Sequence, residues 1–558
     1  MFMKENKSRH KRKGYIKTYV SGFIRAFVIA LLLLFQFGII FLLSYYLIFG
    51  VYIYFAVEIV SVFVVIGLVN KRTNASFKIG WLVTITLVPL AGLVMYLLWG
   101  ANRSNRIKRR NLYYIRYGEQ FLKSDKTVLS NYIERYQRSS NAVTYLENCN
   151  FPLFGNNSFT YYPMGEDAFE AIIEDLEKAE KFIFIDFFIV ADGILWNKIK
   201  EILLEKAKMN VEIKFLYDDY GSMFRTSKQL WNELKENGIE VAEFNSIGKY
   251  IDKLYLNYRS HQKIVVIDGK VGYTGGFNLA DEYVNAVSRF GIWKDTGVRI
   301  EGDGVFGLTA TFLQMWTMTT EKLIEDYNIY KYNPKDDIID KSEYEEACQS
   351  EDKNIDQYET VTSEINDKNK LSSKSGKGFC QIISDGPANN PENPIADTLL
   401  QIIYSSSDYI YITTPYLILD DDIMEALAIS AKRGTDVRII TPGIPDKKII
   451  YQLTKYSYGY LLENGVRIFE YTPGFMHAKT ILTDECALVG TINLDFRSLY
   501  IHYECGALMW DKNMNTDIMN DFKETMDASK EITLEEWKKR PVPIKIIQNF
   551  FNLFSSLM

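Results

Sequence analysis

The sequence predicts an α/β protein with two similar domains, each a mixed sheet flanked by helices, facing each other across one active site behind N-terminal transmembrane helices. After residue 150, short apolar runs alternate with amphipathic segments, as strands alternate with helices. The phrase His-x-Lys followed by four residues and Asp occurs twice, beginning at His261 and at His477. At 558 residues the chain is also too long for one ordinary core.

The two halves repeat one order of elements. In the first half we expect strands over 181–190, 211–217 and 239–244, with helices over 195–209 and 226–237. In the second half we expect strands over 409–413, 437–441 and 466–470, with helices over 421–433 and 446–463. Each motif then gives strand, turn and strand, over 262–267 with 271–274 and over 478–482 with 487–489. The alternative is chance resemblance, but the shared motif at the same place favours duplication.

Each motif carries the groups that phosphoryl transfer needs when no metal takes part. Because residues two apart on a strand share a face, an imidazole lies beside an ammonium in each: His261 with Lys263, and His477 with Lys479. A small-residue turn then leads to an asparagine, Asn278 or Asn493. Two such units would surround a phosphate with cations and amides, while one imidazole attacks phosphorus and the other transfers protons. This chemistry requires no metal and no cofactor.

The remaining motif residues and histidines have other expected places. Asp268 and Asp484 complete the motifs and count among the catalytic candidates. Because they follow the histidines by seven residues, we expect them at strand ends, where they fix a turn or orient an imidazole. We expect His502 to be structural and His10, in a basic run, to be solvated.

Three apolar stretches precede the α/β part. Residues 26–48, 51–69 and 80–100 are each about long enough to cross a bilayer, and Pro89 interrupts the third. Three full spans with a cytoplasmic N-terminus would put the basic segment 101–110 outside, against the positive-inside rule, so one stretch is a candidate re-entrant or interfacial segment. Glu58 is either a functional membrane acid or an interfacial one.

Charge and cysteine usage indicate the location. Basic residues gather in 1–25 and 101–110, next to apolar stretches, which suits both anionic headgroups and topology-setting loops. The five cysteines form no close pair and no metal spacing, which fits a reducing compartment and argues against structural zinc. We therefore expect a multi-pass cell-membrane protein with a cytoplasmic catalytic domain.

Seven segments are expected. The insertion between the two halves, residues 333–378, is acidic, lysine-rich and poor in aliphatic residues, so we predict a disordered passive linker in preference to a regulatory element. The C-terminal tail, residues 541–558, carries apolar residues at helical spacing, which indicates an interfacial helix or one packed on the core; they are Ile547, Phe550, Phe551 and Phe554. The segments are a basic cytoplasmic segment (1–25), a transmembrane region of two or three helices (26–100), a basic connector (101–150), the first α/β domain (151–332), the insertion (333–378), the second α/β domain (379–540) and an amphipathic C-terminal helix (541–558).

At these residues the chain resembles the phospholipase D superfamily and, within it, bacterial cardiolipin synthases. The resemblance covers about residues 50–558 apart from the insertion, and Trp81 to Gly100 is similar to the family's N-terminal membrane segment. The phrases that carry it are Tyr217-Asp218-Asp219-Tyr220-Gly221-Ser222, Asn257 to His261, Thr274 to Tyr283, Trp293-Lys294-Asp295-Thr296, Thr414-Pro415-Tyr416, and Asn493-Leu494-Asp495-Phe496-Arg497-Ser498 with Glu504.

The resemblance implies that two phosphatidylglycerol molecules react to give cardiolipin and glycerol. By their match to the motifs, His261 would be the nucleophile that forms a phosphatidyl-histidine, and His477 the acid and base. The phosphate would be held by Lys263, Lys479, Asn278 and Asn493. The implied partners are phosphatidylglycerol, other anionic lipids and the bilayer, with no nucleic acid; an oligomer is left open.

Several departures leave the acceptor open. Gly276 replaces the superfamily's usual serine, Gly297 stands where the synthases often carry histidine, and the second motif's turn is one residue short. The first alternative is therefore a phospholipase D that passes the phosphatidyl group to water or another alcohol. A membrane-tethered nuclease would need a basic, aromatic-rich tract, which the α/β part lacks. A non-enzymatic lipid-binding scaffold conflicts with two intact motifs.

Overall fold

A computed structural model describes residues 31, 34–42, 47–71, 73–100, 105–246, 258–333, 378–390 and 392–557. The chain divides into two compact units. The apolar unit comprises residues 1–105, 251–257 and 549–558, and the sheet unit comprises residues 106–250 and 258–548. The basic segment 1–25, about half of the first apolar stretch and the insertion over 334–377 lie outside the described residues.

One sheet of fifteen strands runs through both halves of the sheet unit. From its centre, the first half reads β1 (Phe154–Tyr162), β8 (Gly297–Glu301), β6 (Val271–Gly275), β5 (Lys263–Ile267), β2 (Phe182–Phe187), β3 (Glu212–Asp218) and β4 (Glu240–Phe244). The second half reads β9 (Gly378–Asp385), β18 (Glu504–Trp510), β16 (Ala487–Gly490), β15 (Thr480–Thr483), β10 (Tyr409–Thr413), β12 (Asp436–Pro442) and β13 (Arg467–Tyr471), with β19 (Ser529–Ile532) at the edge. The strands predicted from the sequence all form, and their matching order confirms the repeat.

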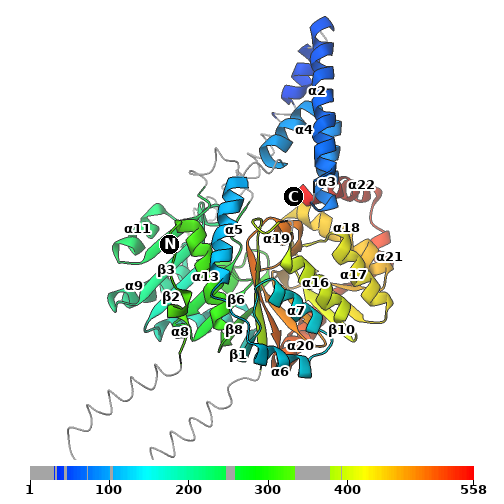
Figure 1. Ribbon diagram of the computed structural model, residues 1–558. Helices are drawn as coiled ribbons and strands as arrows, with labels where there is room; N and C mark the ends of the chain where they lie inside the picture. Colours follow the sequence, from blue (N-terminus) through cyan, green and yellow to red (C-terminus); the bar gives the residue numbers. More distant parts are fainter. Residues whose placement is uncertain are drawn as a thin grey trace, which may run out of the picture. The chain divides into compact units, whose positions relative to one another are not determined.

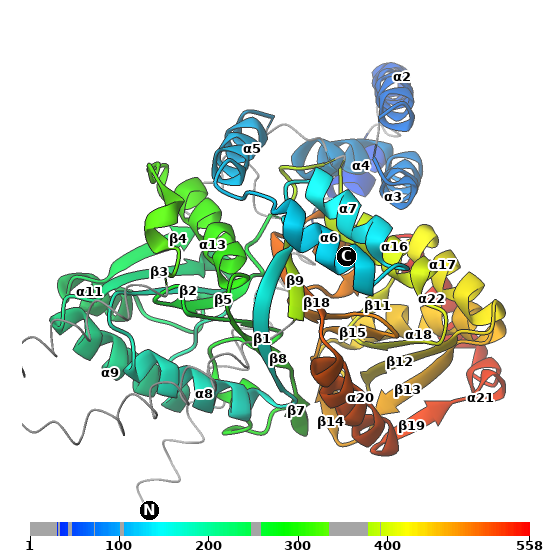
Figure 2. The same cartoon turned by 60° about the horizontal axis from the view of Figure 1, so that its bottom comes forward.

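The two halves join at the middle of the sheet, where β1 pairs antiparallel with β9 (Figure 2). Within each half the three outer repeat strands run parallel, β2 with β3 and β4, and β10 with β12 and β13. The motif strands pair antiparallel with their neighbours, so each half is a mixed sheet as predicted. The two halves thus share one sheet rather than forming separately closed domains.

Alternating side chains give the sheet two buried faces. On β2, Phe182 and Phe184 lie in a core shared by both halves, whereas Ile183 and Ile185 lie in a core of the first half. The shared core also holds α13 (Val305–Thr320) and α20 (Lys512–Asp527). Helices cover the other face of each half (Figure 1): α8 (Gly165–Glu177), α9 (Ile194–Lys208) and α11 (Lys228–Glu236) in the first, and α16 (Pro394–Ser405), α17 (Asp421–Lys432) and α18 (Lys448–Glu463) in the second.

The region predicted as a basic connector is part of the fold. It forms α5 (Asn105–Glu119), α6 (Lys126–Arg135) and α7 (Ser140–Asn148). Tyr132 and Leu146 are fully buried in the second half's core, and the Tyr132 ring lies 5.0 Å from that of Trp510. The apolar residues of α6 and α7 recur at helical spacing, so this region could have been assigned to the core from the sequence.

In the apolar unit, α2 spans Leu47–Val69. Over Val51–Val69 it is long and apolar enough to cross a membrane, and no other helix among the described residues is. Residues 80–100 do not form one continuous helix. They divide into the end of α3 (Ala75–Leu87), α4 (Pro89–Met95) and a π-helical turn over Tyr96–Gly100. Gly92 packs so closely that an added Cβ would lie 2.4 Å from the Thr84 carbonyl oxygen. The third apolar stretch is therefore bent back on itself at Pro89.

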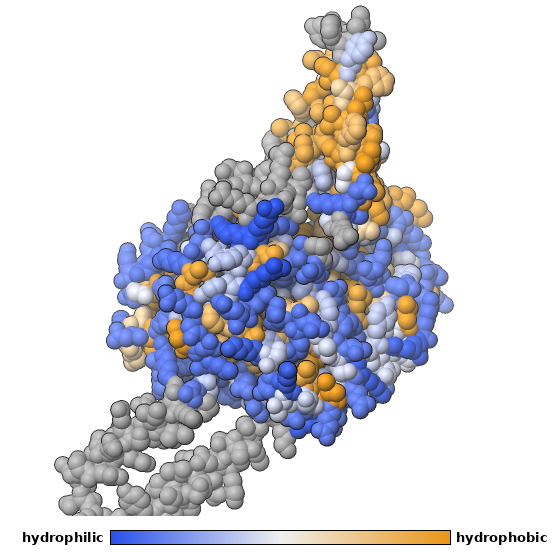
Figure 3. Space-filling model, in the orientation of Figure 1, coloured by the Kyte–Doolittle hydropathy of each residue, from blue (hydrophilic) through white to orange (hydrophobic). Residues whose placement is uncertain are grey.

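The C-terminal segment forms the predicted amphipathic helix, α22 (Val542–Asn552), followed by a 3₁₀ turn over Ser555–Leu557. Gln548 is buried and donates to Gln452 Oε1 at 2.9 Å, whereas Ile546 and Phe550 are exposed by 62% and 55%. Within the apolar unit, Ser556 Oγ donates to the carbonyl of Ser76 on α3. Figure 3 shows the exposed apolar side chains gathered on α2 and its neighbours, while the visible surface of the sheet unit is largely polar.

Candidate active site

Backbone contacts between the two halves hold both motif histidines. His261 precedes β5, and its N–H donates to the carbonyl of Tyr503 at 2.8 Å. His477 precedes β15, and its N–H donates to the carbonyl of Lys294 at 2.8 Å. Each histidine therefore docks on a segment of the opposite half, as duplicated halves related by approximate two-fold symmetry would place it.

The residue after each of those carbonyls supplies a carboxylate to the same histidine. Glu504 Oε2 lies 3.0 Å from His261 Nδ1, and Asp295 Oδ2 lies 2.5 Å from His477 Nδ1. Both carboxylates are fully buried. A carboxylate at Nδ1 keeps the proton on that nitrogen, so Nε2 carries the lone pair available for attack or proton transfer.

The two carboxylates are held differently. Glu504 accepts hydrogen bonds from the hydroxyls of Thr491 and Ser498. Asp295 accepts from the backbone N–H of Thr296 at 3.0 Å. The position equivalent to Thr491 is Gly276, where an added Cβ would lie 2.0 Å from Asp295 Oδ1. The glycine therefore leaves room for the Asp295 carboxylate beside His477.

The motif lysines are buried beside the imidazoles. Lys263 Nζ donates to the carbonyl of His261 at 2.5 Å, and Lys479 Nζ donates to that of His477 and lies 2.8 Å from its Nδ1. Burial lowers the pKa of Lys263 to about 8 and that of Lys479 to about 7. Burial and these two ammonium groups hold the pKa of both imidazoles well below their usual range. The site is a buried cluster, the catalytic cluster, in which two lysines lie beside two neutral imidazoles.

The asparagines lie beside this cluster. Asn278 Oδ1 accepts from the N–H of Ile189 at 3.0 Å, and its Nδ2 donates to the Tyr283 hydroxyl at 2.7 Å, which fixes the amide. Asn493 is 5% exposed, and its Oδ1 has no hydrogen-bond partner among the described residues. The donors that could meet a phosphoryl oxygen are the second N–H of the Asn278 amide and the N–H groups of the Asn493 amide.

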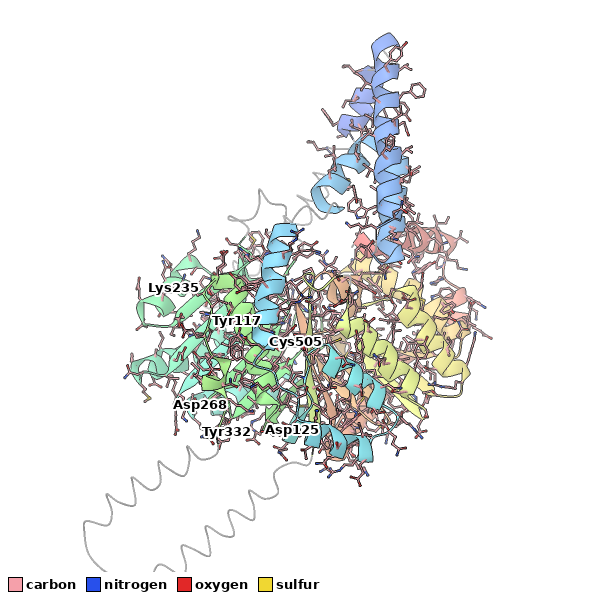
Figure 4. The ribbon with its side chains drawn as sticks, viewed as in Figure 1. Tyr117, Asp125, Lys235, Asp268, Tyr332 and Cys505 are labelled. Carbon is pink, nitrogen blue, oxygen red and sulfur yellow. The ribbon has the colours of Figure 1, made fainter. Side chains whose placement is uncertain are left out.

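Asp268 and Asp484 lie at strand ends as predicted, but neither meets an imidazole among the described residues. Asp268 follows β5 at its far end and accepts from the backbone N–H groups of 180–182. Asp484 accepts from Arg138 and from the N–H of Ser407. Figure 4 shows Asp268 well away from Cys505, the neighbour of Glu504. Of the two expected roles, fixing a turn agrees with these backbone contacts, whereas orienting an imidazole is corrected: Glu504 and Asp295 take that place, because a strand separates each aspartate from its histidine.

Aromatic rings from equivalent positions cover both imidazoles. The Trp293 ring lies 5.2 Å from His477, and the His502 ring lies 5.6 Å from His261. His502 Nδ1 is 3.7 Å from Glu504 Oε1. The sequence interpretation of His502 as structural missed this proximity to the site. The available signal was its place two residues before Glu504, as Trp293 stands before Asp295.

One described cluster could offer several ligand atoms to a metal. His261, His502 and Glu504 bring one ligand atom each within 4.8 Å of one another. His261 Nδ1 and Glu504 Oε2 are already hydrogen-bonded to each other, and the charges of Lys263 and Lys479 oppose a cation at this place. The donor set therefore suits an anion better than a metal ion.

Comparison with known proteins agrees with this geometry. The family described as "Cardiolipin synthase, PLD-like domain" matches residues 172–290 and 399–526, one stretch in each half, and "Phospholipase_D-nuclease N-terminal" matches 59–100. A cardiolipin synthase from a Geobacillus species is 31% identical over 91% of this chain and 94% of its own length. A protein from Streptococcus mutans without an assigned function is 36% identical over 88% of this chain and 99% of its own.

The chain belongs to the cardiolipin synthase family of the phospholipase D superfamily. It is an enzyme of this family, and its function is phospholipid modification. Among solved structures, phosphatidylserine synthase from Haemophilus influenzae matches with a TM-score of 0.51 and 14% identity, over 75% of this chain and 98% of that one, which supports the shared fold.

Two departures from the family pattern have a structural explanation. Gly276 makes room for Asp295, as described above. At Gly297, where cardiolipin synthases often carry histidine, an added Cβ would lie 2.2 Å from Cε1 of Phe277. The Phe277 ring thus occupies this space and packs against Phe169 at 5.0 Å. Neither departure removes a group from the catalytic cluster.

Proposed function

We propose that this protein is a membrane-bound phosphatidyltransferase that makes cardiolipin and glycerol from two phosphatidylglycerol molecules. The observation that supports it most is the pair of buried imidazoles, each oriented by a carboxylate of the opposite half and each beside a buried lysine. This arrangement holds an anionic phosphodiester between a nucleophile and a proton carrier.

In the first step, His261 Nε2 attacks the phosphorus of the donor lipid, and the bond from phosphorus to the glycerol oxygen breaks. His477 gives its proton to that oxygen, and glycerol leaves. The ammonium groups of Lys263 and Lys479 hold the negative charge on the phosphoryl oxygens. The anion offsets the field of these ammonium groups, which raises the pKa of His477 and lets it enter the step protonated.

In the second step, His477 takes the proton of the second lipid's terminal hydroxyl. That oxygen attacks phosphorus, the phosphorus–nitrogen bond breaks, and His261 is regenerated. Glu504 supports the assignment of His261 as nucleophile, because its two hydroxyl donors fix a charged carboxylate beside the imidazole that becomes cationic in the intermediate. Asp295 lacks a side-chain hydroxyl at the equivalent place, and burial raises its pKa to about 7.

The membrane part of the proposal rests on exposed apolar surface. The helix over Val51–Val69 is mostly unburied, and Phe63 and Tyr52 are exposed by 69% and 72%. Such a surface is stable in hydrocarbon and not in water. The exposed side of α22, with Ile546 and Phe550, fits the interfacial zone of the same bilayer. We place the catalytic part on the cytoplasmic side, in agreement with the basic flanks.

The test uses purified protein in phosphatidylglycerol vesicles with chelator present. Wild-type protein and a His10→Ala control should give cardiolipin and glycerol, resolved by mass, while His261→Ala and His477→Ala should give neither. Phosphatidic acid in place of cardiolipin would indicate a hydrolase, and full activity in either active-site variant would refute the two-histidine mechanism. Loss of activity with chelator, restored by a metal, would refute the metal-free reaction.

A further inference from the structure

A third lysine lies near the catalytic cluster, outside the two motifs. Lys447 immediately precedes α18. Its Nζ donates to the Tyr416 hydroxyl at 3.1 Å and lies 3.7 Å from Asp446 Oδ2, while the Tyr416 hydroxyl donates to the same carboxylate oxygen at 2.7 Å. Tyr416 and Asp446 together fix the direction of the ammonium group.

This cluster stands beside the second half's phosphate-binding segment. Tyr416 is followed by β11 (Leu417–Ile418), which pairs in parallel with β17 (Leu494–Asp495), directly after Asn493. The N–H of Leu494 donates to the Thr414 hydroxyl at 3.2 Å. The segments that follow Tyr416 and Asn493 are therefore adjacent strands, and Lys447 is hydrogen-bonded to Tyr416 at the start of the first.

The cluster also lies within electrostatic reach of the imidazoles. Among the charges that shift the pKa of His477 are Asp446, which raises it, and Lys447, which lowers it, and Lys447 lowers the pKa of His261 as well. Lys263 and Lys479 are buried, whereas the Lys447 side chain is 60% exposed. Lys447 is thus an exposed cation whose charge reaches the proposed proton carrier.

The proposed reaction calls for a cation near His477, because the acceptor lipid carries a phosphodiester of its own. The acceptor hydroxyl must reach His477, and in phosphatidylglycerol three carbon atoms link that hydroxyl to the acceptor's own phosphodiester. Water and simple alcohols bring no second anion. An ammonium has three donors, and the described contacts of Lys447 use one of them with Tyr416.

We propose that Lys447, held by Tyr416 and Asp446, binds the phosphodiester of the acceptor lipid and so favours transfer to phosphatidylglycerol over transfer to uncharged acceptors. The site takes a phosphodiester anion whose glycerol hydroxyl points to His477. This inference rests on the proposed function and extends it from the donor's phosphate to the acceptor's.

The test is a competition between acceptors. Full-length protein is given phosphatidylglycerol vesicles with ethanol in the buffer, and cardiolipin and phosphatidylethanol are quantified together by mass. The variants are Lys447→Met, which keeps the aliphatic stem, Lys447→Arg, which keeps the charge, and Lys432→Gln, which removes an exposed lysine at the end of α17.

In Lys447→Met we expect the ratio of cardiolipin to phosphatidylethanol to fall about fivefold, the effect of about 1 kcal/mol at 1.36 kcal/mol per factor of ten. In Lys447→Arg and Lys432→Gln the ratio should stay within about twofold of the wild-type value. An unchanged ratio in Lys447→Met, with wild-type protein making cardiolipin, would overturn the acceptor site and leave the proposed function standing. Phosphatidylethanol without cardiolipin in the wild type would overturn both.

Discussion

Each half supplies the carboxylate that contacts the other half's motif histidine. We therefore predict that Glu504→Gln impairs attack by His261 without unfolding the protein. Glutamine keeps the shape, and its one carbonyl oxygen can still accept from His261 Nδ1 and the Thr491 hydroxyl, while its amide N–H can donate to the Ser498 hydroxyl. The change removes the charge 3.0 Å from the imidazole. A hydrogen bond to a charged group is worth about 1.5–3 kcal/mol. If this is lost as the imidazole becomes cationic, the rate of attack falls about 10- to 150-fold.

A lipid with a p-nitrophenyl headgroup isolates this step, because its leaving group departs without a proton. Rapid mixing should show a fast burst of nitrophenolate in the wild type and a burst slowed about 10- to 150-fold in Glu504→Gln. Asp295→Asn should keep the burst and slow turnover, since Asp295 serves the proton carrier. Glu531→Gln, which alters an exposed pair with Arg467, is the matched control. A burst in Glu504→Gln within twofold of wild type, with unchanged melting temperature, would refute the reasoning.

Three further predictions follow from the same contacts. Gly276→Ser should displace Asp295 from His477 and lower kcat about tenfold or more, with Gly434→Ser as a surface control; unaltered kcat would contradict the close approach. kcat/KM should fall as pH rises through about 7 to 8, where Lys479 and Lys263 lose their protons, and a flat profile from about pH 6.5 to 9 would contradict it. In brominated-lipid vesicles, Phe550→Trp should be quenched and Ile329→Trp should not; equal quenching would argue against α22 at the bilayer.

Local pattern was enough to predict most of the repeat. Short apolar runs specified β2 and β10, and the doubled phrase specified which two histidines matter, because both signals lie within a few neighbouring residues. The family phrases contained Asp295 and Glu504 without indicating their roles. The apolar faces of α6 and α7 were present in the sequence but were assigned to a connector because basic residues precede them.

The sequence by itself determined the duplicated α/β plan, the paired His and Lys groups, and the apolar surface at both ends of the chain, since these depend on residue type and short spacing. Only the tertiary structure decided which carboxylate meets which imidazole. Asp268 is near His261 in sequence, yet Glu504 holds it, because the β1–β9 junction brings the second half's strand across the first half's motif. The place of Lys447 beside Asn493 was likewise decided by contacts between segments distant in sequence.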